Sequence, residues 1–149
     1  MIILATYKFK FQKVLEYRQS LEDQKKNLFS LSMKKYLREK DELNDLYNSL
    51  KNCNNELYKL ASNGTTIGEL RDIYEEQIFY REGIKHKTNA VIKAEEEVKK
   101  NRQELVKAMQ NRKTMERLKE IYYNEFQVDE QRKNEKNIEE IVSFKESRM

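Results

Sequence analysis

The sequence predicts an all-α protein in which two long helices form an antiparallel coiled-coil hairpin. Charged residues make up 38% of its 149 residues, and it contains three Gly and no Pro. Turns usually need Gly or Pro, so the chain is expected to reverse only once or twice. We therefore expect one elongated coiled-coil domain over residues 1–149. Its first helix should cover about 9–60, its turn 61–66 and its second helix about 67–142.

The first helix is predicted from leucines that recur every seven residues. Leu43, Leu50 and Leu57 form one series, and Leu46, Cys53 and Leu60 form a companion series. Their alternating steps of three and four residues are typical of a coiled-coil seam. Toward the N-terminus the seam weakens, with polar residues at three positions and a one-residue phase slip between Leu28 and Tyr36. The residues expected to continue it are Tyr36, Leu28, Leu21, Val14 and Phe11, and the polar ones are Arg18, Lys25 and Ser32.

The turn is predicted at residues 61–68, where small and polar residues cluster. Asn63-Gly64 can adopt the left-handed conformation that ends a helix. Thr66 followed three residues later by Glu69 matches a capping box, which starts the next helix.

The second helix is predicted from two further heptad series. One holds Leu70, Gln77, Ile84, Val91, Val98 and Leu105, and the other holds Tyr80, Ala94, Ala108, Met115 and Tyr122. Leu118 and Ile121 are expected to carry the stripe onward as its phase drifts. The polar stretch 127–136 is the segment most prone to fraying, and the short apolar patch at Ile138, Ile141, Val142 and Phe144 could be ordered by a partner.

Composition argues against an enzyme. With His86 and Cys53 as the only His and Cys, no ordinary transition-metal site, and hence no metal or other cofactor, is expected. No glycine-rich phosphate loop and no apolar run long enough to span a membrane is present. A single Cys fits a reducing compartment, and Met1–Ala5 is too short an apolar stretch for a signal peptide, so the protein is expected in the cytoplasm.

The segment 99–119 is strongly basic, which indicates a docking surface or a solvated helix face. It holds Lys99, Lys100, Arg102, Lys107, Arg112, Lys113, Arg117 and Lys119 against only Glu104 and Glu116. An acidic protein surface or nucleic-acid phosphates could dock here. Aromatic residues that could stack on bases are absent from this segment. We therefore expect protein partners and no nucleic acid, with a nucleic-acid-binding helical arm or an unrelated structural adaptor as alternatives.

Two aromatic groups are further candidate binding surfaces. Tyr36, Tyr47 and Tyr58 are spaced by eleven residues, or about three helical turns, so they lie near one face. They either cover the seam edge or bind a partner. Phe79, Tyr80 and Gly83 form the second group, in which the helical Gly marks a bend, a close approach or a tolerated exception.

Three segments resemble, in order and spacing, motifs of the flagellar export protein FliJ family. Residues 9–18 (FKFQKVLEYR) resemble the family's N-terminus, and residues 112–120 (RKTMERLKE) resemble its Arg-Lys-x-x-Glu-x-Leu-Lys segment. Residues 135–141 (EKNIEEI) resemble its closing acidic motif, with Glu139 in place of Asp.

The resemblance implies a non-enzymatic part of the flagellar type III export apparatus, on the cytoplasmic face of the inner membrane at the flagellar base. Family members resemble the central stalk of rotary ATPases. The resemblance therefore implies three partners: a hexameric export ATPase, the cytoplasmic domain of the export gate protein FlhA, and export chaperones. The residues expected to bind the ATPase are Phe9, Phe11, Val14, Leu15, Arg18, Arg112, Lys113, Glu116, Arg117, Leu118 and Lys119. The gate contact is expected at Phe79, Tyr80 and Gly83.

Overall fold

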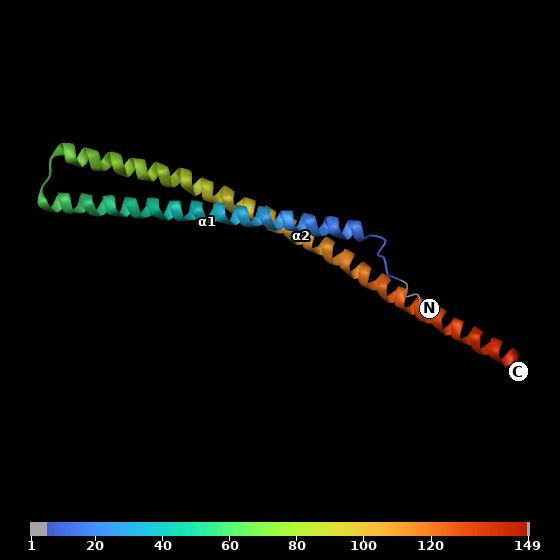
Figure 1. The fold of residues 1–149 in the computed structure, drawn as a ribbon. Coiled ribbons are helices and arrows are strands. Elements are labelled where there is room, and N and C mark those ends of the chain that lie inside the picture. The colour runs from blue at the N-terminus through green and yellow to red at the C-terminus, as the bar shows by residue number, and fades with distance from the viewer. Residues whose placement is uncertain (1–5, 149) are drawn as a thin grey trace. The chain divides into compact units, whose positions relative to one another are not determined.

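The computed structural model describes residues 6–148, and these residues form two long helices. Helix α1 spans Gln12–Asn63 and helix α2 spans Ile67–Ser147 (Figure 1). The two helices pack against each other in opposite directions, and no strand is found in the part that the structure describes. The predicted all-α hairpin is therefore confirmed. The apolar segment Met1–Ala5 lies outside the described residues.

Helix α2 begins at the expected Ile67, and the other helix ends differ from the expected positions by a few residues. Helix α1 begins at Gln12, after a segment without regular secondary structure at 6–9 and a turn at 10–11, and it continues to Asn63. Helix α2 begins at Ile67 and runs without interruption through 127–136 to Ser147.

The reversal at residues 64–66 uses the local signals found in the sequence. Gly64 has a φ of 84°, which an L side chain rarely adopts. Thr66 Oγ1 accepts a hydrogen bond of 3.2 Å from the backbone N–H of Glu69, which satisfies one of the free donors at the start of α2. The Glu69 carboxylate accepts a 2.6 Å bond from the Thr65 hydroxyl, so the capping box is completed by a neighbouring side chain.

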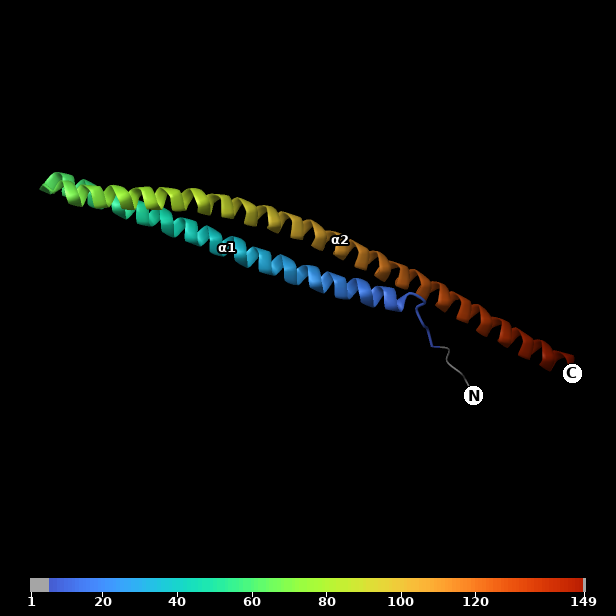
Figure 2. The ribbon, with the colours of Figure 1, turned by 90° about the horizontal axis from the view of Figure 1, so that it is seen from above.

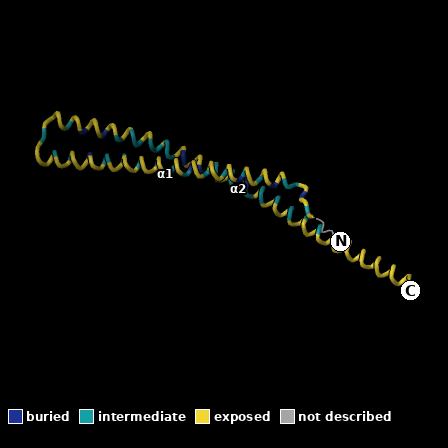
Figure 3. Tube along the Cα trace, in the orientation of Figure 1, coloured by how far each residue is buried: buried dark blue, intermediate teal, exposed yellow. Residues whose placement is uncertain are grey.

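Residues 25–105 pack as one unit, in which the two helices lie side by side from the turn (Figures 1 and 2). The most buried residues are Ser32 and Cys53 on α1 and Ile73, Gln77, Ala94 and Val98 on α2. Cys53 donates to the backbone carbonyl of Ile73 at 3.6 Å, and burial raises the pKa of its thiol, with the charge of Glu76 adding to the effect. Both helices bury a narrow stripe and leave most of their surface exposed (Figure 3).

Residues 6–24 and 106–148 form the second unit. Leu15 and Glu22 of α1 and Ala108 of α2 are buried there. Beyond Glu130 every side chain of α2 up to Arg148 is exposed, because no described part of the chain lies against it (Figure 3).

The seam of α1 corrects one sequence prediction: its phase does not slip. Buried and half-buried residues alternate in steps of three and four from Leu15 to Leu60 without interruption. The seam therefore passes through Glu22, Phe29 and Glu39, while Leu28 and Val14 stay on the flank, exposed at 46% and 40%. Several seam positions are polar, whereas leucines lie at the positions beside them. A pattern traced through the leucines therefore shows a slip that the structure does not have.

The seam of α2 corrects a second prediction. Its heptads continue in phase through Arg112, Lys119 and Tyr122 to Phe126, so no drift carries the stripe onto Leu118 and Ile121. Ile121 is 41% exposed. Ile73, Lys87 and Asn101 complete the companion series that the sequence showed only in part.

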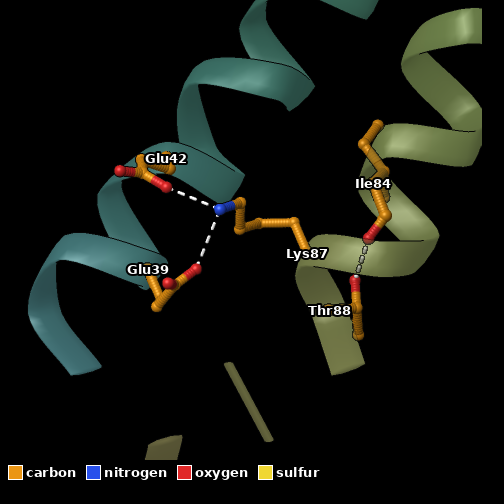
Figure 4. A network of polar contacts seen from close by, with 5 residues as sticks. All are labelled: Glu39, Glu42, Ile84, Lys87 and Thr88. Carbon is orange, nitrogen blue, oxygen red and sulfur yellow. Dashed lines mark hydrogen bonds and ion pairs between the residues drawn. The ribbon is translucent and has the colours of Figure 1, made fainter. Parts of the chain in front are cut away.

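Polar seam residues meet partners on the opposite helix. Lys87 of α2 reaches across to Glu39 at 2.9 Å and to Glu42 at 2.5 Å (Figure 4). Gln77 donates to Asn54 Oδ1 at 2.6 Å, and Lys25 pairs with Glu104 at 3.0 Å. Each of these bonds forms at one register of the helices, so the polar residues specify the alignment that apolar heptads alone would leave open.

Gly83 allows a direct test of helix packing. A Cβ at this position would lie 3.6 Å from two methyl groups of Leu46, which is ordinary contact. We predict that Gly83→Ala stabilises the protein by about 0.5–1 kcal/mol, because Ala loses less backbone entropy in a helix. Thermal unfolding followed by circular dichroism measures the change. Gly64→Ala should have the opposite sign, with a loss of about 1 kcal/mol, because of its positive φ. A loss in both variants would contradict the described packing at Gly83.

The contact between Glu39 and Lys87 predicts a pH dependence. The hydrogen bond from Lys87 holds the pKa of Glu39 below its ordinary 4.5, although burial opposes the shift. The pair therefore stabilises the fold fully above the unfolded carboxyl's pKa, and this contribution is lost as the pH falls through the lower folded pKa. Acid should lower the unfolding midpoint of the native sequence more steeply than that of Glu39→Gln. Glu75→Gln, an exposed control, should follow the native curve.

Candidate functional site

An aromatic cluster closes the end of the paired region in the unit of residues 6–24 and 106–148. The segment before α1 carries aromatic residues at alternate positions, Tyr7, Phe9 and Phe11. Phe9 is buried and lies 6.0 Å from the ring of Tyr122, and Phe11 lies 6.3 Å from it, between ring centroids. The backbone N–H of Gln12 bonds the carbonyl of Phe9 at 3.2 Å, which joins this segment to the first turn of α1.

Tyr7 extends the cluster along α2. Its ring centroid is 5.3 Å from those of both Tyr123 and Phe126, and its hydroxyl donates to the backbone carbonyl of Lys119 at 3.3 Å. Burial, with a smaller effect from Tyr122, raises the pKa of Tyr7. Tyr7, Tyr123 and Phe126 were not among the predicted site residues. The alternation of aromatic residues at 7, 9 and 11 was the signal that could have found them.

The guanidinium of Arg112 is held within the seam. Its Nε contacts the buried carboxylate of Glu22, and its Nη1 lies 2.7 Å from Glu116. Hydrogen bonds to Glu116 and then to Glu22 raise the pKa of Arg112. Charge-assisted bonds of this kind lock a side chain in place, so Arg112 serves the hairpin itself.

The predicted ATPase-binding residues are brought together in this unit, but they differ in exposure. Phe9 and Leu15 are buried. The half-buried members are Phe11, Arg18, Arg112, Leu118 and Lys119, and Lys119 donates to Gln12 at 2.9 Å. The exposed members are Val14, Lys113, Glu116 and Arg117. This last group is the most accessible to a partner, and the half-buried residues offer only part of their surface.

A shallow hollow on α2 combines the exposed cations with apolar side chains. We call it the Leu118 patch, lined by Lys113, Thr114, Arg117, Leu118 and Ile121. Arg117 is 72% exposed and is paired at 3.1 Å only with Glu120, one turn away on the same exposed helix face. Surface pairs of this kind are weak, so Arg117 can exchange its partner at little cost.

The predicted gate-binding residues do not form one surface. Phe79 is 70% exposed, whereas Tyr80 is half-buried at a seam position and its ring packs edge-on against Phe79 at 5.6 Å. A Cβ at Gly83 would meet Leu46 at an ordinary contact distance, so the packing there does not require glycine. Phe79 alone offers a large apolar group to a partner.

The C-terminal part of α2 carries a separate apolar stripe. Ile138, Ile141, Val142 and Phe144 are exposed by 48–60%, and Phe144 lies under the guanidinium of Arg148 at 4.7 Å. This stripe does not continue the seam, whose heptad positions here are Lys133, Lys136 and Glu140.

Residues 6–148 contain neither a cluster of metal-binding side chains nor a membrane-spanning stretch. Between residues 6 and 148 no three His, Cys, Asp or Glu side chains converge on a possible metal site. Neither helix contains, over the same residues, a stretch long and apolar enough to cross a membrane.

The fold and its exposed patches define a protein of the antiparallel helical-hairpin class. The profile of the flagellar FliJ protein family matches residues 7–148, so the chain belongs to that family. Membership makes it a component of flagellar type III export. Among solved structures, one described as a YscO homologue, CT670 from Chlamydia trachomatis, is similar with a TM-score of 0.58 and 18% identity. The similarity covers 93% of this chain and 94% of that chain, and it shows a shared fold. No match was found among curated protein sequences.

The contact between Glu22 and Arg112 can be tested by exchanging its charges. Glu22→Ala should lower the unfolding midpoint by several degrees, because it removes the partner that Arg112 holds across the seam. The exchange Glu22→Arg with Arg112→Glu should recover part of the loss, since opposite charges face each other again. Equal midpoints for Glu22→Ala and the native protein would show that this contact does not stabilise the hairpin.

Proposed function

We propose that the protein is a non-enzymatic, central-stalk-like coiled coil that binds and stimulates the hexameric flagellar export ATPase. The observation that carries this proposal is the Leu118 patch, in which unburied apolar groups lie beside Lys113 and the weakly paired Arg117. Such a surface suits a partner with an apolar contact rimmed by acidic groups. Family membership and the FliJ-like motif at 112–120 support the choice of the ATPase as that partner.

The two parts of the proposed ATPase site have different tasks. The aromatic cluster around Phe9 and Tyr122, with Leu15, holds the segment before α1 and the start of α1 against α2. Val14, Lys113, Glu116 and Arg117 then supply the exposed contact groups. A rigid end of this kind limits the conformational entropy lost on insertion into a ring.

Contacts with the export gate and with chaperones complete the proposal. Phe79, exposed on α2, is the residue of the predicted group that suits the cytoplasmic domain of the gate protein FlhA. Tyr80, at a seam position, packs against Phe79, and Gly83 lies one turn further along α2. Together with binding to export chaperones, such contacts would hold the protein at the cytoplasmic face of the membrane, at the flagellar base.

The ATPase proposal is tested by measuring ATP hydrolysis by the purified cognate hexamer with and without this protein. The native chain should raise the rate and show no hydrolysis alone. The double variant Lys113→Glu, Arg117→Glu should reduce the stimulation about tenfold, because it reverses the charge at the rim of the Leu118 patch.

The control for this experiment is Lys34→Glu, Lys59→Glu, which makes the same charge change at exposed positions of α1. It should stimulate as the native chain does. Circular dichroism confirms that both double variants fold. Equal stimulation by all three proteins would remove the Leu118 patch from the mechanism, and no stimulation by the native chain would overturn the proposed function.

A further inference from the structure

In residues 25–105, the two sides of the seam, which we call its flanks, carry different charged residues. Lys35 and Glu97 each directly precede a seam residue, and they pair across the helices at 3.8 Å. Residues that precede seam positions therefore share one flank in this antiparallel pair. Residues that directly follow seam positions share the other flank. Asn54, which follows Cys53, lies on this flank and bonds the seam residue Gln77.

The flank formed by residues that directly follow seam positions contains almost no acids. We call it the basic flank. It contains Lys26, Lys40, Lys51, Arg71, Arg81, Lys85, Lys99 and Arg102, against the single acid Glu95. The preceding residues form the acidic flank. Its acids are Glu42, Asp45, Glu56, Glu69, Asp72, Glu76, Glu97 and Glu104, and its bases are Lys35, Arg38, Lys59, Lys93 and Lys100.

The ion pairs within the hairpin leave several cations of the basic flank free to bind an external group. On the acidic flank, Glu42 binds Lys87, Glu97 binds Lys35 and Glu104 binds Lys25. On the basic flank, Lys51, Arg71, Arg81 and Lys85 make no ion pair with any described residue from 6 to 148. Because the basic flank combines these four unpaired cations with a single acid, Glu95, which binds Lys99, an external anion would be drawn to it.

Exposed apolar side chains lie among these cations on both helices. They are Leu37, Tyr47 and Tyr58 on α1 and Tyr74, Ile78 and Ile92 on α2, with exposed fractions of 48–77%. Leu37 and Tyr47 border an open hollow on α1, which is also lined by Lys40, Asp41, Leu43 and Asn44. The contact of Gly83 with Leu46 and that of Lys87 with Glu42 set the register, which brings Leu37 level with Ile92 and Tyr58 level with Arg71.

We propose that the basic flank of residues 25–105 binds an acidic amphipathic helix of a partner protein, which packs along the seam as a third helix. Its apolar face would cover Leu37, Tyr47, Ile78 and Ile92, and its carboxylates would pair with Lys51, Arg81 and Lys85. Apolar anchors repeated along a groove between two helices are the recognition pattern for a third helix. This surface and its partner are additional to the ATPase contact, since the Leu118 patch contains none of these residues.

The apolar residues favour a helix over nucleic acid or a membrane. In nucleic-acid binding, cations pair with phosphates and aromatic rings stack on bases, as the tyrosines of this flank could. The exposed aliphatic groups of Leu37, Ile78 and Ile92 suit neither contact, but they suit the apolar face of a helix. Membrane-bound helices carry one broad apolar face, whereas here the apolar groups are divided between two helices with cations between them.

The probe is a stapled helical peptide about five turns long. It carries leucines along one face and glutamates beside them, and a twin carries lysine at each glutamate position. Fluorescence anisotropy with the full chain, without ATPase, measures affinity. The acidic peptide should bind at least about tenfold more tightly than its basic twin. Lys51→Glu, Arg81→Glu, Lys85→Glu should weaken that binding at least about tenfold, and Ile78→Ser, Ile92→Ser should weaken it several-fold.

Matched controls change the acidic flank in the same way. Lys59→Glu, Lys93→Glu, Lys100→Glu reverses three exposed charges there, and Leu28→Ser, Leu31→Ser removes two exposed apolar groups. Both should bind the acidic peptide within about twofold of the native chain. Equal weakening by the two charge variants would overturn the proposal. So would tighter, basic-flank-dependent binding to single-stranded RNA or to phosphatidylserine vesicles. Because no ATPase is present, this outcome is independent of the proposed function.

Discussion

The alignment of the two helices depends on polar residues placed inside a thin apolar seam. Leucines and valines repeated every seven residues would tolerate a shift by one heptad, since apolar groups would still meet apolar groups. Glu22 with Arg112, Glu39 with Lys87 and Gln77 with Asn54 would not, because a shift separates each from its partner. An unpaired charge or amide in the seam is costly, so these residues select one register. The positions of every flank residue follow from that choice.

A seam this narrow leaves most side chains for other contacts, and the charge pattern decides which of them are available. Arg112, Lys87 and Lys25 belong to a basic protein but are bound by its own acids. Lys113 in one unit and Arg81 and Lys85 in the other have no such partner among the described residues. Net charge therefore describes this molecule poorly. Its binding potential lies in the cations that the seam and its edges leave unpaired.

Sequence periodicity predicted the helices, their reversal at Gly64 and nearly the whole seam of α2, because regular apolar spacing and turn residues are local signals. It failed in the N-terminal half of α1, where Glu22, Phe29 and Glu39 occupy seam positions and Leu21 and Leu28 lie beside the first two. A hydrophobic pattern follows the leucines and misplaces the seam by one residue. The proposed ATPase site was similarly incomplete, because Tyr7 and Phe126 join it through contacts between distant parts of the chain.

What the amino-acid sequence by itself determined is the class of structure: long helices, one tight reversal and an antiparallel pair with a surface rich in charge. Those properties depend on residue spacing and on local backbone preferences. Only the tertiary structure decided which charges are neutralised within the chain, which of the predicted contact residues are buried, and which flank each side chain occupies. The physical reason is that these features depend on the partner across the seam. From the sequence alone, Glu22 cannot be distinguished from an exposed glutamate. Its role depends on the contact with Arg112, which only the folded hairpin forms.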